Sequence, residues 1–285
     1  MKLRHLKAIG LTLVLGLTTQ GVSAATSNQS VAEQPRSIED ILHLTYWGNV
    51  AGPGISNFGK SETPHTDAGT MNLFSSAQIG YKLNSAEAFF ANPRFLTNLV
   101  TDADRNGFGS TQWLNPRFGY KDSQMFVSES GNTSLYGNIH VELPLGDGSN
   151  TSLAIAPGFS NFLSINFSGS RWSYGQWSTL RFYIYGVKPK EAQKFLQIEF
   201  YPEMDYKISK DLTFRFLTRF EYGPNEFQGF AMDAVLDGAL IAFQPGISWD
   251  IASGLNINPY VQLRPKQGFS LDSSSIGMEI SGSVF

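Results

Sequence analysis

Apolar and polar residues alternate with a period of two along most of the chain. In residues 211–222, for example, Phe214 and Phe216 fall on one side of the alternation, whereas Arg215 and Arg219 fall on the other. Successive side chains of a β-strand point to opposite faces, so this pattern predicts strands with one apolar and one polar face.

About twelve such segments follow one another, and an even number of alternating segments of about ten residues is typical of a transmembrane β-barrel. Short connections alternate with long ones, as in barrels whose tight turns face the periplasm. We therefore predict an all-β fold, a single antiparallel transmembrane β-barrel of about 12 strands over residues 41–285, with both chain ends on the periplasmic side. The segments are 41–51, 70–83, 87–98, 112–121, 132–145, 151–167, 172–187, 193–208, 211–222, 237–251, 254–265 and 274–285; the short connections are 84–86, 209–210 and 252–254, and the long ones are 52–69, 99–111 and 223–236.

A soluble β-sandwich is the alternative fold, because its strands alternate in the same way. A sandwich buries its apolar face and exposes a highly charged one. Here the apolar face carries ring-bearing residues at the segment ends, which is the arrangement expected of aromatic girdles at two membrane interfaces. This favours the barrel. The residues are Tyr46, Tyr81, Tyr120, Trp172, Tyr206 and Trp249.

The first residues have the three parts of a cleavable signal peptide. A basic region that includes Lys2, Arg4 and Lys7 precedes an apolar run at residues 8–17, and Val22-Ser23-Ala24 is a small-residue cleavage site. An uncleaved anchor helix is the alternative, but the apolar run is shorter than the roughly 20 residues of a membrane span. We predict a signal peptide over residues 1–24 and a short periplasmic tail over residues 25–40.

Composition narrows the possible partners. Charged residues make up 16% of the chain and aromatic residues 13%, whereas about 25% charged residues is usual in soluble domains. Removing Lys2, Arg4 and Lys7 with the leader leaves 18 of the 21 Lys and Arg residues against 24 Asp and Glu, a net charge of −6. No basic stripe remains, so we expect no nucleic-acid partner. The chain has no cysteine, which excludes disulfides, thiolate metal sites and a lipid-anchored cysteine.

The leader, the alternation and the final residue, Phe285, together resemble the bacterial outer-membrane β-barrel proteins, a broad porin-like class. The resemblance covers residues 41–285 as a pattern and indicates no specific family. It implies location in the outer membrane of Gram-negative bacteria, contact with outer-membrane lipid, and recognition of the terminal aromatic residue by the barrel assembly machinery. Phe285 departs from the usual pattern, because it falls out of phase with the apolar residues Ile276, Met278 and Ile280.

The polar face of the predicted strands would line the lumen with charges of both signs. The sequence Asn-Pro-Arg-Phe occurs twice, at residues 92–95 and 115–118. Proline cannot donate to a strand ladder, so we expect bulges at both motifs. We also expect the side-chain amides of Asn92 and Asn115 to face the lumen and to bond to carbonyls or to charged side chains. The candidate lumen and selectivity residues are Asn92, Arg94, Asn115, Arg117, Glu199, Glu203, Arg215, Arg219 and Arg264.

A narrow porin-like channel for small polar solutes or ions is the function that this pattern favours. A plugged structural or surface-interaction barrel, in which paired charges fill the lumen, is the main alternative. An outer-membrane enzyme is less favoured, because His43 and His140 have no recognisable nucleophile motif nearby. We expect no cofactor and no metal site, and we interpret the acidic residues Asp102 and Asp104 as part of a solvated loop.

Overall fold

The computed structural model describes residues 38–54, 71–100, 111–146, 153–186, 195–223, 239–265, 269–270 and 274–283. The predicted signal peptide, most of the predicted tail, most of the three long connections, Asp102, Asp104 and Phe285 lie outside these residues. Among the described residues, none forms a helix of the length and apolarity that crossing a membrane requires.

Strands make up most of the described chain, and each predicted segment contains at least one. A four-residue helix, α2 (Ile38–Ile41), precedes the first strand. The strands are β1 (Leu42–Gly54), β2 (Met71–Lys82), β3 (Glu87–Val100), β4 (Thr111–Val127), β5 (Thr133–Glu142), β6 (Leu153–Asn166), β7 (Trp172–Phe182), β8 (Ile184–Tyr185), β9 (Leu196–Lys207), β10 (Leu212–Tyr222), β11 (Leu240–Ala252), β12 (Leu255–Gln262) and β13 (Ser275–Ser283).

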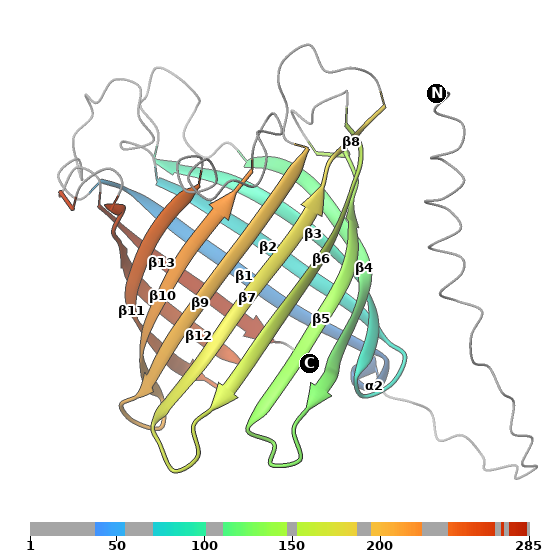
Figure 1. The fold of residues 1–285 in the computed structure, drawn as a ribbon. Coiled ribbons are helices and arrows are strands. Elements are labelled where there is room, and N and C mark those ends of the chain that lie inside the picture. The colour runs from blue at the N-terminus through green and yellow to red at the C-terminus, as the bar shows by residue number, and fades with distance from the viewer. Residues whose placement is uncertain are drawn as a thin grey trace, which may run out of the picture. The chain divides into compact units, whose positions relative to one another are not determined.

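The strands close into one antiparallel barrel (Figure 1). Apart from β8, each strand pairs with the strands before and after it, so that β7 pairs with β9; β1 also pairs with β13, and the pairing of β5 with β6 completes the ring. The two-residue strand β8 continues the line of β7 along β6, so the wall has 12 strands. Closure leaves no free sheet edge, as the predicted fold requires.

Tight turns join the strands at one end of the barrel, where the sequence predicts them (Figure 1). The N–H of Leu83 donates to the carbonyl of Glu87 at 2.9 Å and closes the turn between β2 and β3. Gly254, with φ +73°, closes the turn between β11 and β12, where a Cβ atom would lie 2.8 Å from the carbonyl oxygen of Ser283. A side chain at this position would therefore be strained both by the backbone and by the close approach.

Strand β4 is longer than the sequence predicts, because it ends at Val127 rather than at residue 121. The register between β4 and β5 shifts between Asp122 and Phe126, and pairing resumes with Phe126 opposite Leu135. A bulge of this kind interrupts the period-two alternation, which hides the end of the strand from the sequence pattern.

The two faces of the wall have the predicted phase. Phe216 on β10 points outward and is 39% exposed, whereas its neighbour Arg215 points inward and contacts Glu203. Gly175 on β7 also points inward, because a Cβ atom there would meet the Glu203 side chain. Large apolar side chains are exposed along the outward rows of nearly every strand; they include Ile79, Phe89, Ile139, Phe159, Ile247 and Ile276.

Aromatic pairs lie on the outward rows near the strand ends, as a membrane-interface girdle requires. Trp172 and Tyr206 approach to 4.9 Å between ring centroids close to the tight-turn end. Phe95 and Trp113 approach to 4.8 Å near the opposite ends of β3 and β4.

A charge placed on the outward row tests this assignment of the two faces. Phe216→Arg should lower the free energy of unfolding from lipid by about 2–4 kcal/mol, because it buries a charge in hydrocarbon near the middle of β10. Thr213→Arg, on the inward row of the same strand, should cost far less. Urea unfolding of both variants in lipid vesicles measures the difference, and equal losses would show that the two faces are wrongly assigned.

Candidate functional site in the barrel lumen

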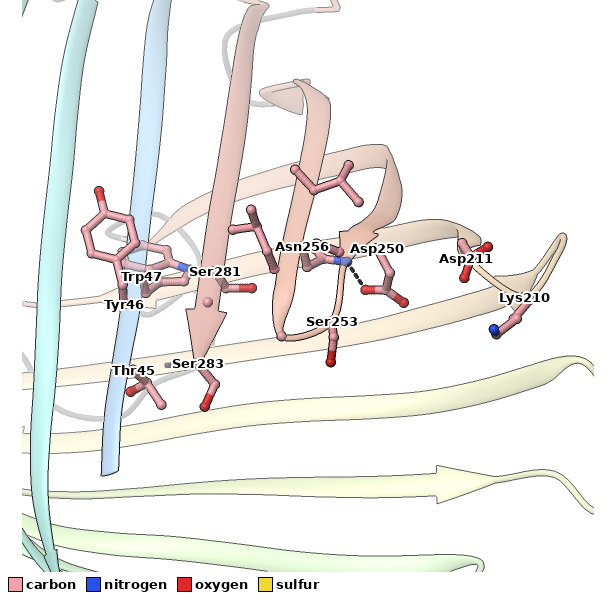
Figure 2. A pocket seen from close by; sticks show the side chains of 15 residues that line it. Thr45, Tyr46, Trp47, Lys210, Asp211, Asp250, Ser253, Asn256, Ser281 and Ser283 are labelled. Carbon is pink, nitrogen blue, oxygen red and sulfur yellow. Dashed lines mark hydrogen bonds between the residues drawn. The ribbon is translucent and has the colours of Figure 1, made fainter. Parts of the chain in front are cut away.

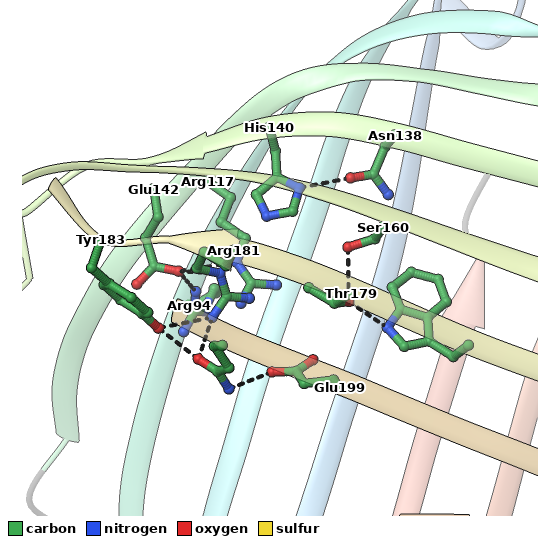
Figure 3. A network of polar contacts seen from close by, with 12 residues as sticks. Arg94, Arg117, Asn138, His140, Glu142, Ser160, Thr179, Arg181, Tyr183 and Glu199 are labelled. Carbon is green, nitrogen blue, oxygen red and sulfur yellow. Dashed lines mark hydrogen bonds and ion pairs between the residues drawn. The ribbon is translucent and has the colours of Figure 1, made fainter. Parts of the chain in front are cut away.

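Three arginines meet one glutamate inside the barrel, and we call these four residues the arginine group (Figure 3). Atom Oε2 of Glu142 on β5 lies 2.8 Å from Arg94 Nη1, 3.2 Å from Arg117 Nε and 3.8 Å from Arg181 Nε. The arginines come from β3, β4 and β7, so two of the three contacts reach past an intervening strand. The group therefore joins the wall across the curvature of the lumen.

Further polar groups complete the surroundings of Arg181, which keeps only 4% of its side chain accessible. Its Nη1 atom donates to Gln197 Oε1 at 3.0 Å and to the Tyr183 hydroxyl at 3.2 Å. Gln197 in turn donates to Glu199 at 2.6 Å. Buried charges require partners, and this network supplies some of those that the three neighbouring guanidinium groups need.

A second cluster, which we call the acidic group, comprises Glu203, Asp205 and Glu279 around Arg215. Arg215 forms a close ion pair with Glu203, lies 3.9 Å from Asp205 Oδ1 and reaches Glu279 Oε2 at 3.4 Å. Glu279 lies on β13, three strands from β10 around the wall, so this contact also spans the curvature of the lumen. Carboxylates outnumber the guanidinium here, whereas arginines outnumber the carboxylate in the arginine group.

Several charged side chains of the inward rows keep part of their surface accessible. Arg117 keeps 26% of its side chain accessible, Asp205 28% and Arg219 29%. Glu142, by contrast, keeps 8%. The lumen is therefore only partly filled by its own ion pairs.

The inward rows also hold an aromatic cluster that the sequence interpretation missed. Tyr136 lies 5.4 Å from Phe162 and 6.1 Å from Trp177 between ring centroids. The indole N–H of Trp177 donates to the Thr179 hydroxyl at 3.0 Å, and this hydroxyl also bonds to Ser160, which is 2% exposed. These aromatic residues occupy the polar row of the alternation, and that row indicates side chains that face the lumen.

The two strand histidines bond to groups that do not form a catalytic pair. Atom Nδ1 of His140 lies 2.8 Å from Asn138 Oδ1, and Nε2 of His43 lies 2.6 Å from Lys121 Nζ and 3.3 Å from Gln78 Nε2. Among the described residues, no cluster of acidic or histidine side chains could hold a metal ion.

The first Asn-Pro-Arg-Phe motif behaves as predicted and the second does so in part. The register shifts between Asn92 and Arg94, which places a bulge at the prolines of β3 and β4. Asn92 Nδ2 donates to the carbonyl of Ala77 at 3.0 Å, in the strand that Pro93 cannot bond. Asn115 accepts instead, since its Oδ1 atom bonds to the N–H of Gly146 at 3.0 Å, and its predicted donor contact stays a prediction.

A cavity of about 920 Å³ lies at the tight-turn end of the barrel (Figure 2). Thr45, Trp47 and Ser281 from inward rows line it, together with residues of the turns that follow β9 and β11. Asn256 donates to Asp250 at 2.7 Å on its wall. Polar and apolar side chains therefore share the lining of this cavity, and the apolar ones include Ile251 and Leu255.

The structure divides the predicted lumen residues among these groups. Arg94 and Arg117 belong to the arginine group, and Glu199 lies beside it; Glu203 and Arg215 belong to the acidic group. Arg219 pairs with Glu221. Arg264 follows the end of β12, apart from both groups. Glu142, Arg181 and Glu279 are not among the predicted selectivity residues, although the alternation places Glu142 and Arg181 on the polar face.

Removing the shared carboxylate tests the arginine group. Glu142→Gln should lower the free energy of unfolding by roughly 3–5 kcal/mol, because it leaves buried guanidinium groups without a countercharge. Glu279→Gln is the matched control and should cost less, because Arg215 retains Glu203. Urea unfolding of refolded protein compares the two, and equal losses would contradict the central place of Glu142.

Comparison with known proteins gives similarity in fold alone. No protein-family model matches the chain, and no curated protein matches it in sequence. An outer-membrane channel from Pseudomonas putida F1 superimposes with a TM-score of 0.51 at 8% identity, over 88% of this chain and 100% of that one. The NanC porin gives 0.44 at 10% identity, over 84% of this chain and 97% of that one. The Salmonella typhi outer-membrane phospholipase dimer with bound calcium gives 0.42 at 8% identity, over 85% and 89%.

Only the first of these three is similar enough in structure to support a statement about the fold. That likeness agrees with the closed ring of 12 strands, the apolar outward rows and the polar inward rows described above. The chain accordingly has the fold of the bacterial outer-membrane β-barrels, which agrees with the predicted location in the bacterial outer membrane.

Proposed function

We propose that the barrel is a narrow channel that passes small polar solutes or ions through its lumen. The observation that carries this proposal is the accessible surface of charged side chains inside the wall, with Arg117, Asp205 and Arg219 each about a quarter accessible. Charged groups that touch water inside a membrane-spanning barrel line an aqueous path. The cavity at the tight-turn end, which inward residues such as Thr45 and Ser281 help to line, supports the same interpretation.

Contacts between strands that are not neighbours support a narrow path. Arg215 reaches Glu279 across the wall, and Tyr260 on β12 donates to Asn49 on β1 at 2.9 Å. Such side chains occupy part of the cross-section. A 12-strand barrel encloses more space than barrels of about eight strands and less than the wide porins of about 16.

The main alternative is a structural or surface-interaction barrel whose lumen is plugged. The described residues form wall strands, the turns between them and α2, and none of these elements crosses the lumen. A channel rather than an enzyme also remains a prediction, which lipase and peptidase assays on refolded protein test.

Ion selectivity follows from the imbalance within the arginine group. Replacing Arg94 and Arg117 together with Ala removes two positive charges from the lumen, while Arg181 still faces Glu142. We expect the barrel to stay folded and its permeability to shift from anions toward cations, because rings of charge set the preference of a pore. Arg171→Ala removes a positive charge from a turn outside the wall strands and is the matched control.

Single-channel recording in planar bilayers, with a salt gradient to give the reversal potential, measures both properties. Discrete conductance steps, and a reversal potential that moves in the double variant but not in the control, are the expected results. Folded protein that gives no conductance steps would favour the plugged barrel and contradict the proposed channel.

A further inference from the structure

One line of polar residues interrupts the apolar outward surface of the barrel. Tyr174, Gln176 and Ser178 follow one another along the outward row of β7, and Asn161 on β6 faces Ser178. We call these four residues the polar line.

The inward contacts of neighbouring residues fix the outward direction of the polar line. Ser160 bonds to Thr179 in the buried interior, and Gly175 faces Glu203 across the inward side. Since successive side chains of a strand alternate, Asn161 and Gln176 point away from the lumen.

The polar line lies at the middle of the wall rather than at a rim. The aromatic residues Trp172 and Phe182 are the two ends of β7, so Gln176 and Ser178 flank the centre of the strand. The residues paired with Gln176 on either side are apolar, Leu163 on β6 and Pro202 on β9. At this depth the surroundings are acyl chains and offer no hydrogen bonds.

The rest of the outward surface is different. Outside the bulge at Asn115 and Pro116, no other outward position between the ends of the described strands carries an amide or a charge. The acidic residues Glu87 and Asp122, which lie opposite each other in the register, are at the tight-turn end. Single hydroxyl groups such as those of Ser75 and Thr218 do occur. Two amides on adjacent strands are therefore particular to the surface of β6 and β7.

Contacts within the polar line use only part of its hydrogen-bonding capacity. The Tyr174 hydroxyl donates to Gln176 Oε1 at 2.7 Å, and Gln176 Nε2 donates to the Ser178 hydroxyl at 3.1 Å. A primary amide has two N–H donors and two acceptor sites, so Gln176 keeps capacity for one further donor and one further acceptor contact. In hydrocarbon this capacity is costly unless a partner supplies it.

We propose that the polar line is the contact surface for a second copy of this chain within the membrane. A surface that offers both a donor and an acceptor is complementary to itself across a twofold axis, where each Gln176 amide can bond to an amide of the other copy. Lipid headgroups lie at the membrane surface rather than at the centre of β7, so they fit the polar line less well.

The absence of cysteine from the chain permits a direct test. Leu163→Cys places one thiol beside the polar line and leaves all four of its residues intact. Phe216→Cys places a thiol near mid-strand on the outward surface of β10. Each variant is refolded into phosphatidylcholine–phosphatidylglycerol vesicles and oxidised, and a disulfide-linked dimer is expected for Leu163→Cys but not for Phe216→Cys.

Removing the amides should abolish the preferential cross-linking at residue 163 while leaving the barrel folded. In Leu163→Cys carrying also Asn161→Leu and Gln176→Leu, the association constant of the dimer should fall roughly tenfold or more, because each amide bond is lost twice across the axis. Mobility shifts on boiling and unchanged conductance would show that the wall and lumen are intact.

Equal cross-linking of the two cysteine variants would overturn the proposal. So would dimerisation that persists undiminished after both amides are replaced. Because the leucines touch no lumen residue, loss of the dimer with unchanged conductance separates this interface from the proposed channel.

Discussion

The pairing of backbone groups in a medium without water is the constraint on which the rest of the structure depends. Hydrocarbon offers no partner to an N–H or a carbonyl, so a sheet can cross it only as a closed ring. The pairing of β1 with β13 and of β5 with β6 provides that closure. Pro93 removes a donor from the ladder. The side chain of Asn92, the residue before it, donates to the Ala77 carbonyl. The motif thus introduces a break in the ladder and supplies a bond beside it.

Closure of the sheet gives every strand one face toward the lumen and one face toward lipid. Polar side chains meet different conditions on the two faces. Inside, charges find partners across the curvature of the wall, as Glu142 does with arginines from three strands. Those pairs occupy part of the lumen, while Arg117 and Asp205 keep part of their surface accessible. Outside, the same rule that requires paired backbone groups makes an amide such as Gln176 costly, and a second copy of the chain is the partner that its chemistry fits.

The sequence was sufficient to predict the strands and the direction of their side chains, because both follow from a period of two. It was not sufficient to predict which charges pair. Arg215 and Glu279 are 64 residues apart and meet through the stagger of strands around the barrel, which alternation does not encode. The end of β4 was missed for a related reason, since the shift after Asp122 breaks the alternation. Tyr136 and Trp177 show that an aromatic residue can line the lumen as well as the membrane surface.

Water access to adjacent residues of one strand tests most directly whether the inward rows line a hydrated path. Arg117 and Phe118 are neighbours on β4, one inward and partly accessible and the other exposed on the outward surface. Each is replaced by Cys in the cysteine-free chain, and the rate of modification by a charged, water-soluble thiol reagent is measured in lipid vesicles. Rapid modification of Arg117→Cys with protection of Phe118→Cys is the predicted result. Protection of both positions would show a closed lumen and contradict the account.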